Sequence, residues 1–136
     1  MVLAERQPVM RAALQILLST VDDLTVVASV DDVGDLVRTV ASHQPDVVIL
    51  DVGSCVTIAE VLRSVPGVAV LVFTASEDTA SLCSALRTGA RGYLLRTTEP
   101  AAILQAIQGV ATGSVILGPS VAAKLSELLS TTPPPD

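Results

Sequence analysis

With 136 residues, the chain has the length of one domain with a full hydrophobic core. Its net charge of −6, without any cluster of lysines and arginines, argues against direct nucleic-acid binding by these residues. Half of the residues are apolar but only Phe73 and Tyr93 are aromatic, so Val, Leu, Ile and Ala must build the core. That composition suits buried parallel strands covered by helices.

The chain contains no apolar run of the roughly 18–20 residues that a membrane span requires, and no signal segment opens it. Cys55 and Cys83 lie in no CxxC spacing and predict no disulfide framework. We therefore expect a cytoplasmic protein that does not contact a membrane.

Short apolar runs alternate with helical stripes along the chain. The β-rich runs predict five buried strands, at residues 2–4, 24–28, 47–50, 68–73 and 93–95. The first helix is predicted by apolar residues at i, i+3, i+4 spacing: Val9, Ala12, Ala13, Ile16 and Leu17. Similar stripes predict helices around residues 33–40, 58–65, 82–86 and 103–111.

The resulting order is five βα units in about 112 residues, which predicts a doubly wound parallel sheet with helices on both faces. We expect these units to form one domain over residues 1–113, followed by an extra amphipathic helix within 114–130. Residues 131–136 are rich in proline and have the composition of a linker.

Polar residues follow the predicted strands at their carboxyl ends. Glu5 and Arg6 follow the first strand, Asp51 the third, Thr74 the fourth and Arg96 the fifth. In a sheet of order 2-1-3-4-5, the crevice lies outside the carboxyl ends of strands 1 and 3, where the strand order reverses. These side chains are therefore expected to rim one crevice.

At these residues the chain resembles a response-regulator receiver domain of the NarL/FixJ type, with a flavodoxin-like fold. The resemblance rests on LAERQP at 3–8, PDVVILD at 45–51, VLVFTA at 70–75, GARGYLLR at 89–96 and GSVILGP at 113–119. It implies that Asp51 is the phosphoacceptor candidate, and that Thr74 and Tyr93 are switch residues. On the residues alone, Thr74 is equally an ordinary strand-end hydroxyl and Tyr93 an ordinary core aromatic.

The departures from the family pattern gather in its metal-binding and phosphorylation site. Glu5 and Arg6 stand where the family has an acidic pair that holds Mg²⁺, and Arg96 stands where it has a lysine. We expect Arg6 to pair with Asp51 or Glu5 and to take the place of the metal; the alternative is a solvated residue at the start of a helix. No metal is expected; if one binds, its ligands are Glu5, Asp51 and Gly53.

The leading functional prediction is an atypical regulatory receiver, not an enzyme, that acts as a homodimer independently of ordinary Mg²⁺-dependent phosphorylation. One alternative is a conventional receiver whose Asp51 accepts a phosphoryl group, with Mg²⁺, from a sensor histidine kinase. Another is a sensor of a small anionic ligand, with Arg6 and Arg96 at the crevice. Any DNA contact would come from a missing helix-turn-helix output domain, and no other cofactor is expected.

Overall fold

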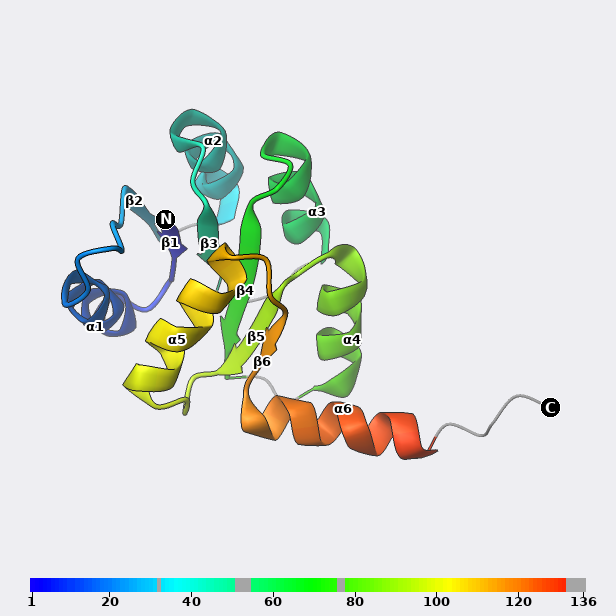
Figure 1. Cartoon of the computed structure of the whole chain (residues 1–136). Helices are drawn as coiled ribbons and strands as arrows, with labels where there is room; N and C mark the ends of the chain where they lie inside the picture. Colours follow the sequence, from blue (N-terminus) through cyan, green and yellow to red (C-terminus); the bar gives the residue numbers. More distant parts are fainter. Residues whose placement is uncertain (32, 51–54, 76–77, 132–136) are drawn as a thin grey trace.

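The computed structural model describes residues 1–31, 33–50, 55–75 and 78–131. Six parallel strands form one sheet in the order β2-β1-β3-β4-β5-β6, with helices on both faces (Figure 1). The strands are β1 (Val2–Ala4), β2 (Ala28–Val30), β3 (Val47–Leu50), β4 (Ala69–Thr74), β5 (Gly92–Leu95) and β6 (Ile116–Leu117). The helices are α1 (Pro8–Ser19), α2 (Val33–His43), α3 (Cys55–Ser64), α4 (Thr79–Thr88), α5 (Pro100–Ala111) and α6 (Pro119–Thr131).

The doubly wound α/β fold and the predicted strand order 2-1-3-4-5 are confirmed, with one strand more than expected. The additional β6 pairs Ile116 with Gly92 and Leu117 with Tyr93. Two residues are too few to show the alternating pattern of a strand. Gly109 lets β6 lie against α5, because a Cβ on Gly109 would come within 2.9 Å of the Ile116 side chain.

The second strand lies further along the chain than its apolar residues predicted. Residues 24–28 were expected to form it, whereas β2 pairs Ala28, Ser29 and Val30 with β1. Leu24 and Val26 instead pack as partly buried side chains against the α1 and α5 side of the core. The apolar run was thus a covering segment and not the strand itself.

Two hydrophobic clusters lie on opposite faces of the sheet, because successive side chains of a strand point to opposite sides. One cluster joins β-strand residues to α2, α3, α4 and α6, and includes Tyr93. The other joins the opposite strand face to α1 and α5. No helix in the described part of the chain is long and apolar enough to cross a bilayer.

The apolar stripe that predicted α1 is not the buried face of that helix. Leu14 and Leu18 are buried in the core, whereas the Val9 and Ile16 residues are 84% and 69% exposed. Ala12 and Ala13 are exposed as well. Helix α1 therefore has a second apolar face on the surface of the protein.

Candidate functional site

The candidate site lies at the carboxyl end of the sheet, where β1 separates β2 from β3. Glu5 follows β1 directly, and its backbone N–H donates to the Val30 carbonyl at 3.1 Å, which continues the β1–β2 pairing by one residue. This places the Glu5 side chain inside the rim, where it is only 1% exposed. A buried carboxylate requires hydrogen-bond donors or a counter-charge.

Arg96, which follows β5, supplies that counter-charge. Its Nη2 donates to Glu5 Oε1 at 2.8 Å and to Oε2 at 2.6 Å, while Nη1 donates to the side-chain oxygen of Gln7 at 2.9 Å. The Gln7 backbone N–H also donates to Glu5 Oε1, at 3.1 Å. The guanidinium lies 5.8 Å from the centroid of the Phe73 ring, within the range of a cation–π contact.

The backbone holds Arg96 at this position. Its N–H donates to the Thr74 carbonyl at 3.0 Å, so the residue after β5 is tied to the end of β4. The Arg96 side chain is only 12% exposed. The carboxylate and the guanidinium are thus both largely removed from water, and each holds the other in a fixed place.

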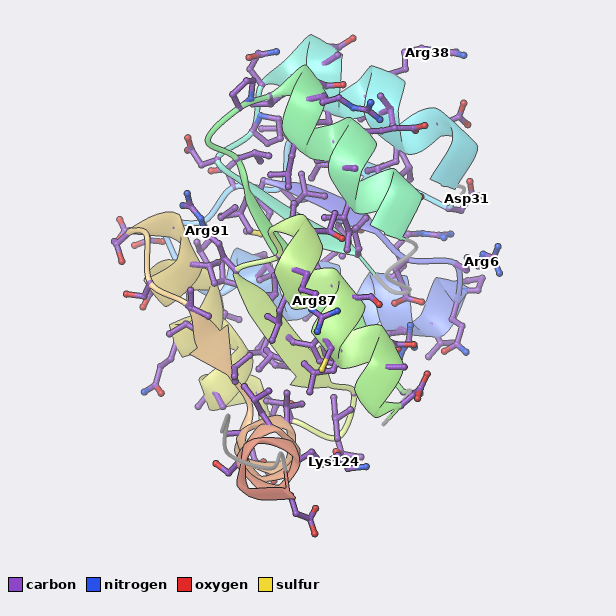
Figure 2. The ribbon with its side chains drawn as sticks, turned by 90° about the vertical axis from the view of Figure 1, so that its right-hand side faces the viewer. Arg6, Asp31, Arg38, Arg87, Arg91 and Lys124 are labelled. Carbon is purple, nitrogen blue, oxygen red and sulfur yellow. The ribbon has the colours of Figure 1, made fainter. Side chains whose placement is uncertain are left out.

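The structure bears on one of the two partners expected for Arg6. The Arg6 side chain is exposed at the edge of the site (Figure 2) and, among the residues that the structure describes, it has no hydrogen-bond or ion-pair partner. At Glu5 the pairing cation is Arg96 and not Arg6. The other expected partner, Asp51, lies outside the described residues, as does Gly53.

The described residues alone do not supply a set of ligands for a magnesium ion, and two of the three expected ligands, Asp51 and Gly53, lie outside them. Mg²⁺ is held mainly by carboxylate oxygens and water in tight octahedral geometry, and both oxygens of Glu5 already accept hydrogen bonds from a cation. Arg6 stands where a second carboxylate would be needed. Within the described ranges, no group of three or more His, Cys, Asp or Glu side chains is arranged to hold a metal.

Thr74 and Tyr93, the expected switch residues, are both buried. Thr74 is 4% exposed at the end of β4, and Tyr93 is 3% exposed in the cluster that α4 and α6 cover. Burial raises the pKa of the Tyr93 hydroxyl, and the negative charge of Asp78 raises it further. The tyrosine ring therefore points into the protein.

The polar residues at the strand ends do not include Gln7, which lies in the site, or Asp78, which interacts with Tyr93. Gln7 holds both Arg96 and Glu5, and no sequence signal marks it. Asp78 is the N-cap of α4 and accepts hydrogen bonds from Ser81 Oγ at 2.9 Å and from the Ala80 N–H at 3.3 Å. The Ser81 hydroxyl in particular holds the pKa of Asp78 below its usual value. An Asp just before a helix is a recognisable capping signal.

Comparisons with known proteins agree with this architecture. Residues 1–108 match the response regulator receiver domain family. The oxygen regulatory protein NreC of Staphylococcus carnosus is 28% identical over 130 residues, which cover 91% of this chain. The nitrate/nitrite response regulator protein homolog of Haemophilus influenzae is 33% identical over 131 residues, or 92% of this chain. The chain spans 60% of the first relative and 62% of the second.

Among solved structures, a two-component response regulator of the LuxR family from Aurantimonas sp. SI85-9A1 superposes with a TM-score of 0.89 at 25% identity. The match covers 95% of this chain and 96% of that one. The sequence match, the strand order and the position of the site at the strand ends lead to one conclusion. The chain belongs to the response regulator receiver domain family, and its relatives are response regulators of the NarL and LuxR type.

Proposed function

We propose that this chain is a non-enzymatic receiver module of a cytoplasmic transcriptional response regulator, and that it signals without ordinary Mg²⁺-dependent phosphorylation of Asp51. The observation that carries the proposal is the ion pair between Arg96 and Glu5, 2.6 Å long and almost fully buried. The carboxylate that a receiver would offer to a cation is already bound by a cation of the protein itself.

The net charge of the three residues at the site also disfavours a divalent cation. The family pattern has two acidic residues and a lysine, which sum to −1, whereas Glu5, Arg6 and Arg96 sum to +1. The difference of two units disfavours a divalent cation. Transfer of a phosphoryl group to a carboxylate relies on such a cation to offset the charge of the transferring oxygens.

A cation that needed Glu5 would first have to displace Arg96. The Arg96 Nη2 bonds to both oxygens of Glu5 would be lost in that exchange. Each loss of about 1.4 kcal/mol that the cation does not offset weakens its binding about tenfold. The phosphoryl-accepting alternative therefore has to overcome both the net charge and the existing pair.

Signalling by association is supported by the surface of α1. Val9, Ala12, Ala13 and Ile16 form an exposed apolar stripe, and Arg11 is the one charged residue of α1, with its Nη1 bonded to the Glu5 carbonyl at 2.8 Å. Helix α5, in the same layer, carries no charged residue. Two copies of a chain with a net charge of −6 repel each other least where no carboxylate faces the other copy. The proposed partner is therefore a second copy, with DNA contacted by the remainder of a longer protein.

The anionic-ligand alternative gains no support from the site. Of its two expected cations, Arg96 is bound to Glu5 and Gln7, which leaves Arg6 alone at the surface. A lone exposed arginine does not make a pocket.

The proposal is tested by intact-mass analysis after incubation with a small acyl-phosphate donor and Mg²⁺. We expect no phosphoryl adduct on the native chain. A stoichiometric adduct that is lost in Asp51→Asn would refute the proposal. The double variant Arg6→Asp with Arg96→Lys restores the family pattern and is expected to gain an adduct. The matched control, Arg38→Asp with Arg87→Lys, makes the same changes away from the site and is expected to gain none.

A further inference from the structure

Gln7 is the residue through which α1 is joined to the candidate site. It is the N-cap residue of α1, and its carbonyl accepts the first hydrogen bond of the helix, from the Arg11 N–H at 2.9 Å. Its side chain makes no capping bond to the helix. The side-chain oxygen instead accepts from Arg96 Nη1 at 2.9 Å, and the Gln7 N–H donates to Glu5 Oε1 at 3.1 Å. These two bonds therefore both end on the Glu5–Arg96 ion pair.

The start of α1 has neither a side-chain cap nor an acidic residue in its first turn, the two features that usually stabilise the positive end of a helix. Helix α4 differs, because the Asp78 side chain accepts a hydrogen bond from the Ala80 N–H and caps it. A further contact at the start of α1 again ends on Glu5, whose carbonyl accepts from Arg11 Nη1 at 2.8 Å. Helix α1 is thus anchored at its start by the site and not by a cap of its own.

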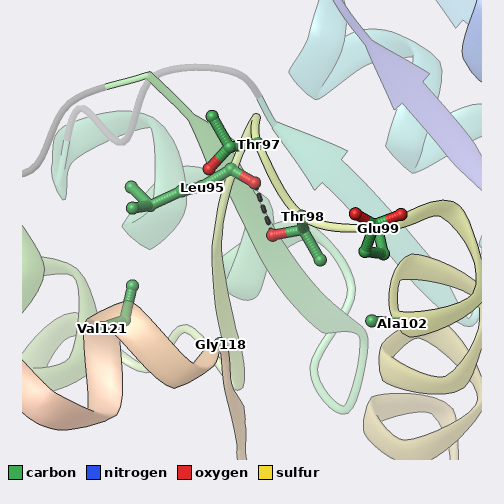
Figure 3. Close-up of a pocket in the computed structure, with 7 residues that line it drawn as sticks. All are labelled: Leu95, Thr97, Thr98, Glu99, Ala102, Gly118 and Val121. Atoms are coloured by element: carbon green, nitrogen blue, oxygen red, sulfur yellow. Dashed lines mark hydrogen bonds between the residues drawn. The ribbon is translucent and has the colours of Figure 1, made fainter.

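Arg96 is the fixed side of this junction. Its N–H donates to the Thr74 carbonyl at the end of β4. It also lies in a turn that closes on Leu95, whose carbonyl accepts hydrogen bonds from both the N–H and the hydroxyl of Thr98. Figure 3 shows the hydroxyl bond at the edge of a pocket that Leu95 and Thr98 help to line. Because the turn is bonded to two strands, the start of α1 is the side of the junction with fewer contacts of its own.

We infer that Gln7 is a positioning residue that orders the first turn of α1 only while Arg96 holds Glu5. Without Arg96, the Gln7 side chain loses its donor, and the Glu5 carboxylate is no longer held toward the Gln7 N–H. The first turn carries Val9 and leads to Ala12, two residues of the exposed apolar stripe. The consequence rests on the proposed function, in which that stripe meets a second copy: the cation at Glu5 sets the order of the pairing surface without a phosphoryl group.

Hydrogen exchange of residues 8–13, followed by mass spectrometry at a concentration low enough to keep the chain monomeric, tests the inference. Gln7→Met keeps the length of the side chain and removes its oxygen, and Gln15→Met makes the same change at another exposed position of α1. We expect Gln7→Met to speed exchange in residues 8–13 about fivefold, as the loss of one hydrogen bond predicts. Gln15→Met should behave as the native chain, and residues 14–19 should keep native exchange in both variants.

Two further variants separate positioning by Arg96 from a general effect of residue 7. Gln7→Glu keeps an oxygen that accepts from Arg96, so its exchange should return to the native rate. In the Arg96→Ala chain, where the donor is already lost, adding Gln7→Met should cause no further increase.

Native exchange in Gln7→Met, or the same fivefold increase in the absence of Arg96, would overturn the inference. Should Arg96→Ala fail to fold, the exposed residue 7 still decides, because equal exchange in Gln7→Met and Gln7→Glu would overturn it as well. At higher concentration, Gln7→Met should shift sedimentation toward the monomer, and unchanged association despite a frayed first turn would refute the link to the second copy. The exchange measurement involves neither a phosphoryl donor nor a dimer, so its failure is distinguishable from failure of the proposed function.

Discussion

The two arginines beside Glu5 offer a direct contrast between a buried and an exposed cation. Replacing Arg96 by alanine removes the Nη2 bonds to both oxygens of Glu5, the Nη1 bond to Gln7 and the contact with Phe73. Replacing Arg6 by alanine removes an exposed side chain that has no partner among the described residues. We expect only the first change to lower the free energy of unfolding markedly.

The magnitude follows from the state of Glu5 after the change. Its side chain is 1% exposed, and among the described residues the Gln7 N–H is the one remaining donor to its carboxylate. Removing one partner of a buried ion pair costs about 3–5 kcal/mol. Because Arg96 is 12% exposed and water can enter the space that it leaves, we expect the lower end, about 3 kcal/mol. Arg6→Ala should fall within about 0.5 kcal/mol of the native chain.

Urea unfolding followed by far-ultraviolet circular dichroism measures both differences. A second pair of variants isolates the interaction: Glu5→Gln should itself be destabilising, and Glu5→Gln with Arg96→Ala should cost less than the sum of the two single changes. Equal losses for Arg96→Ala and Arg6→Ala, or strictly additive losses in this cycle, would refute the claim that Arg96 is the cation of the site.

The other predictions concern the surface, the switch residue and a strained turn. Ile16→Glu on the exposed face of α1 should shift the protein from dimer to monomer in sedimentation velocity, whereas its exposed neighbour Gln15→Glu should not; identical sedimentation would contradict the proposed interface. The pKa of Tyr93 is raised by burial, so its contribution to stability is complete below pH about 10 and is lost as the pH rises through the higher folded pKa. Tyr93→Phe should reduce the fall in urea midpoint as the pH rises above about 10. An unchanged fall would show that the ionisation of Tyr93 does not cause it. Gln44 follows α2 in the left-handed backbone region, with a φ of 49°, where a side chain is unfavourable and glycine is not. Gln44→Gly should therefore raise the free energy of unfolding by about 0.5–1 kcal/mol. A lower urea midpoint would contradict this expectation.

The strand order and the convergence of Glu5, Thr74 and Arg96 could be predicted because both depend on local patterns. Short apolar runs alternating with helical stripes permit few topologies, and parallel strands bring their carboxyl ends to one edge. The partner of Glu5 could not be predicted in this way. Two arginines lie close to it in the expected fold, and the burial of their side chains decides between them.

Helix α1 shows a second limit of periodicity. Its sequence carries two apolar faces, one with Val9 and Ile16 and the other with Leu14 and Leu18. The longer leucines fill the core, and the first face remains at the surface. Spacing identifies a helix but does not choose between two apolar faces, because that choice depends on the volume available between α1 and the sheet.

In the proposed function, Arg96 takes the place of a divalent cation at Glu5. Titration with Mn²⁺, followed by the paramagnetic signal of the free ion, tests it most directly on the native chain and on Arg6→Asp with Arg96→Lys. We expect no saturable binding to the native chain at millimolar Mn²⁺ and measurable binding to the double variant. Saturable binding to the native chain that is lost in Glu5→Gln would contradict it.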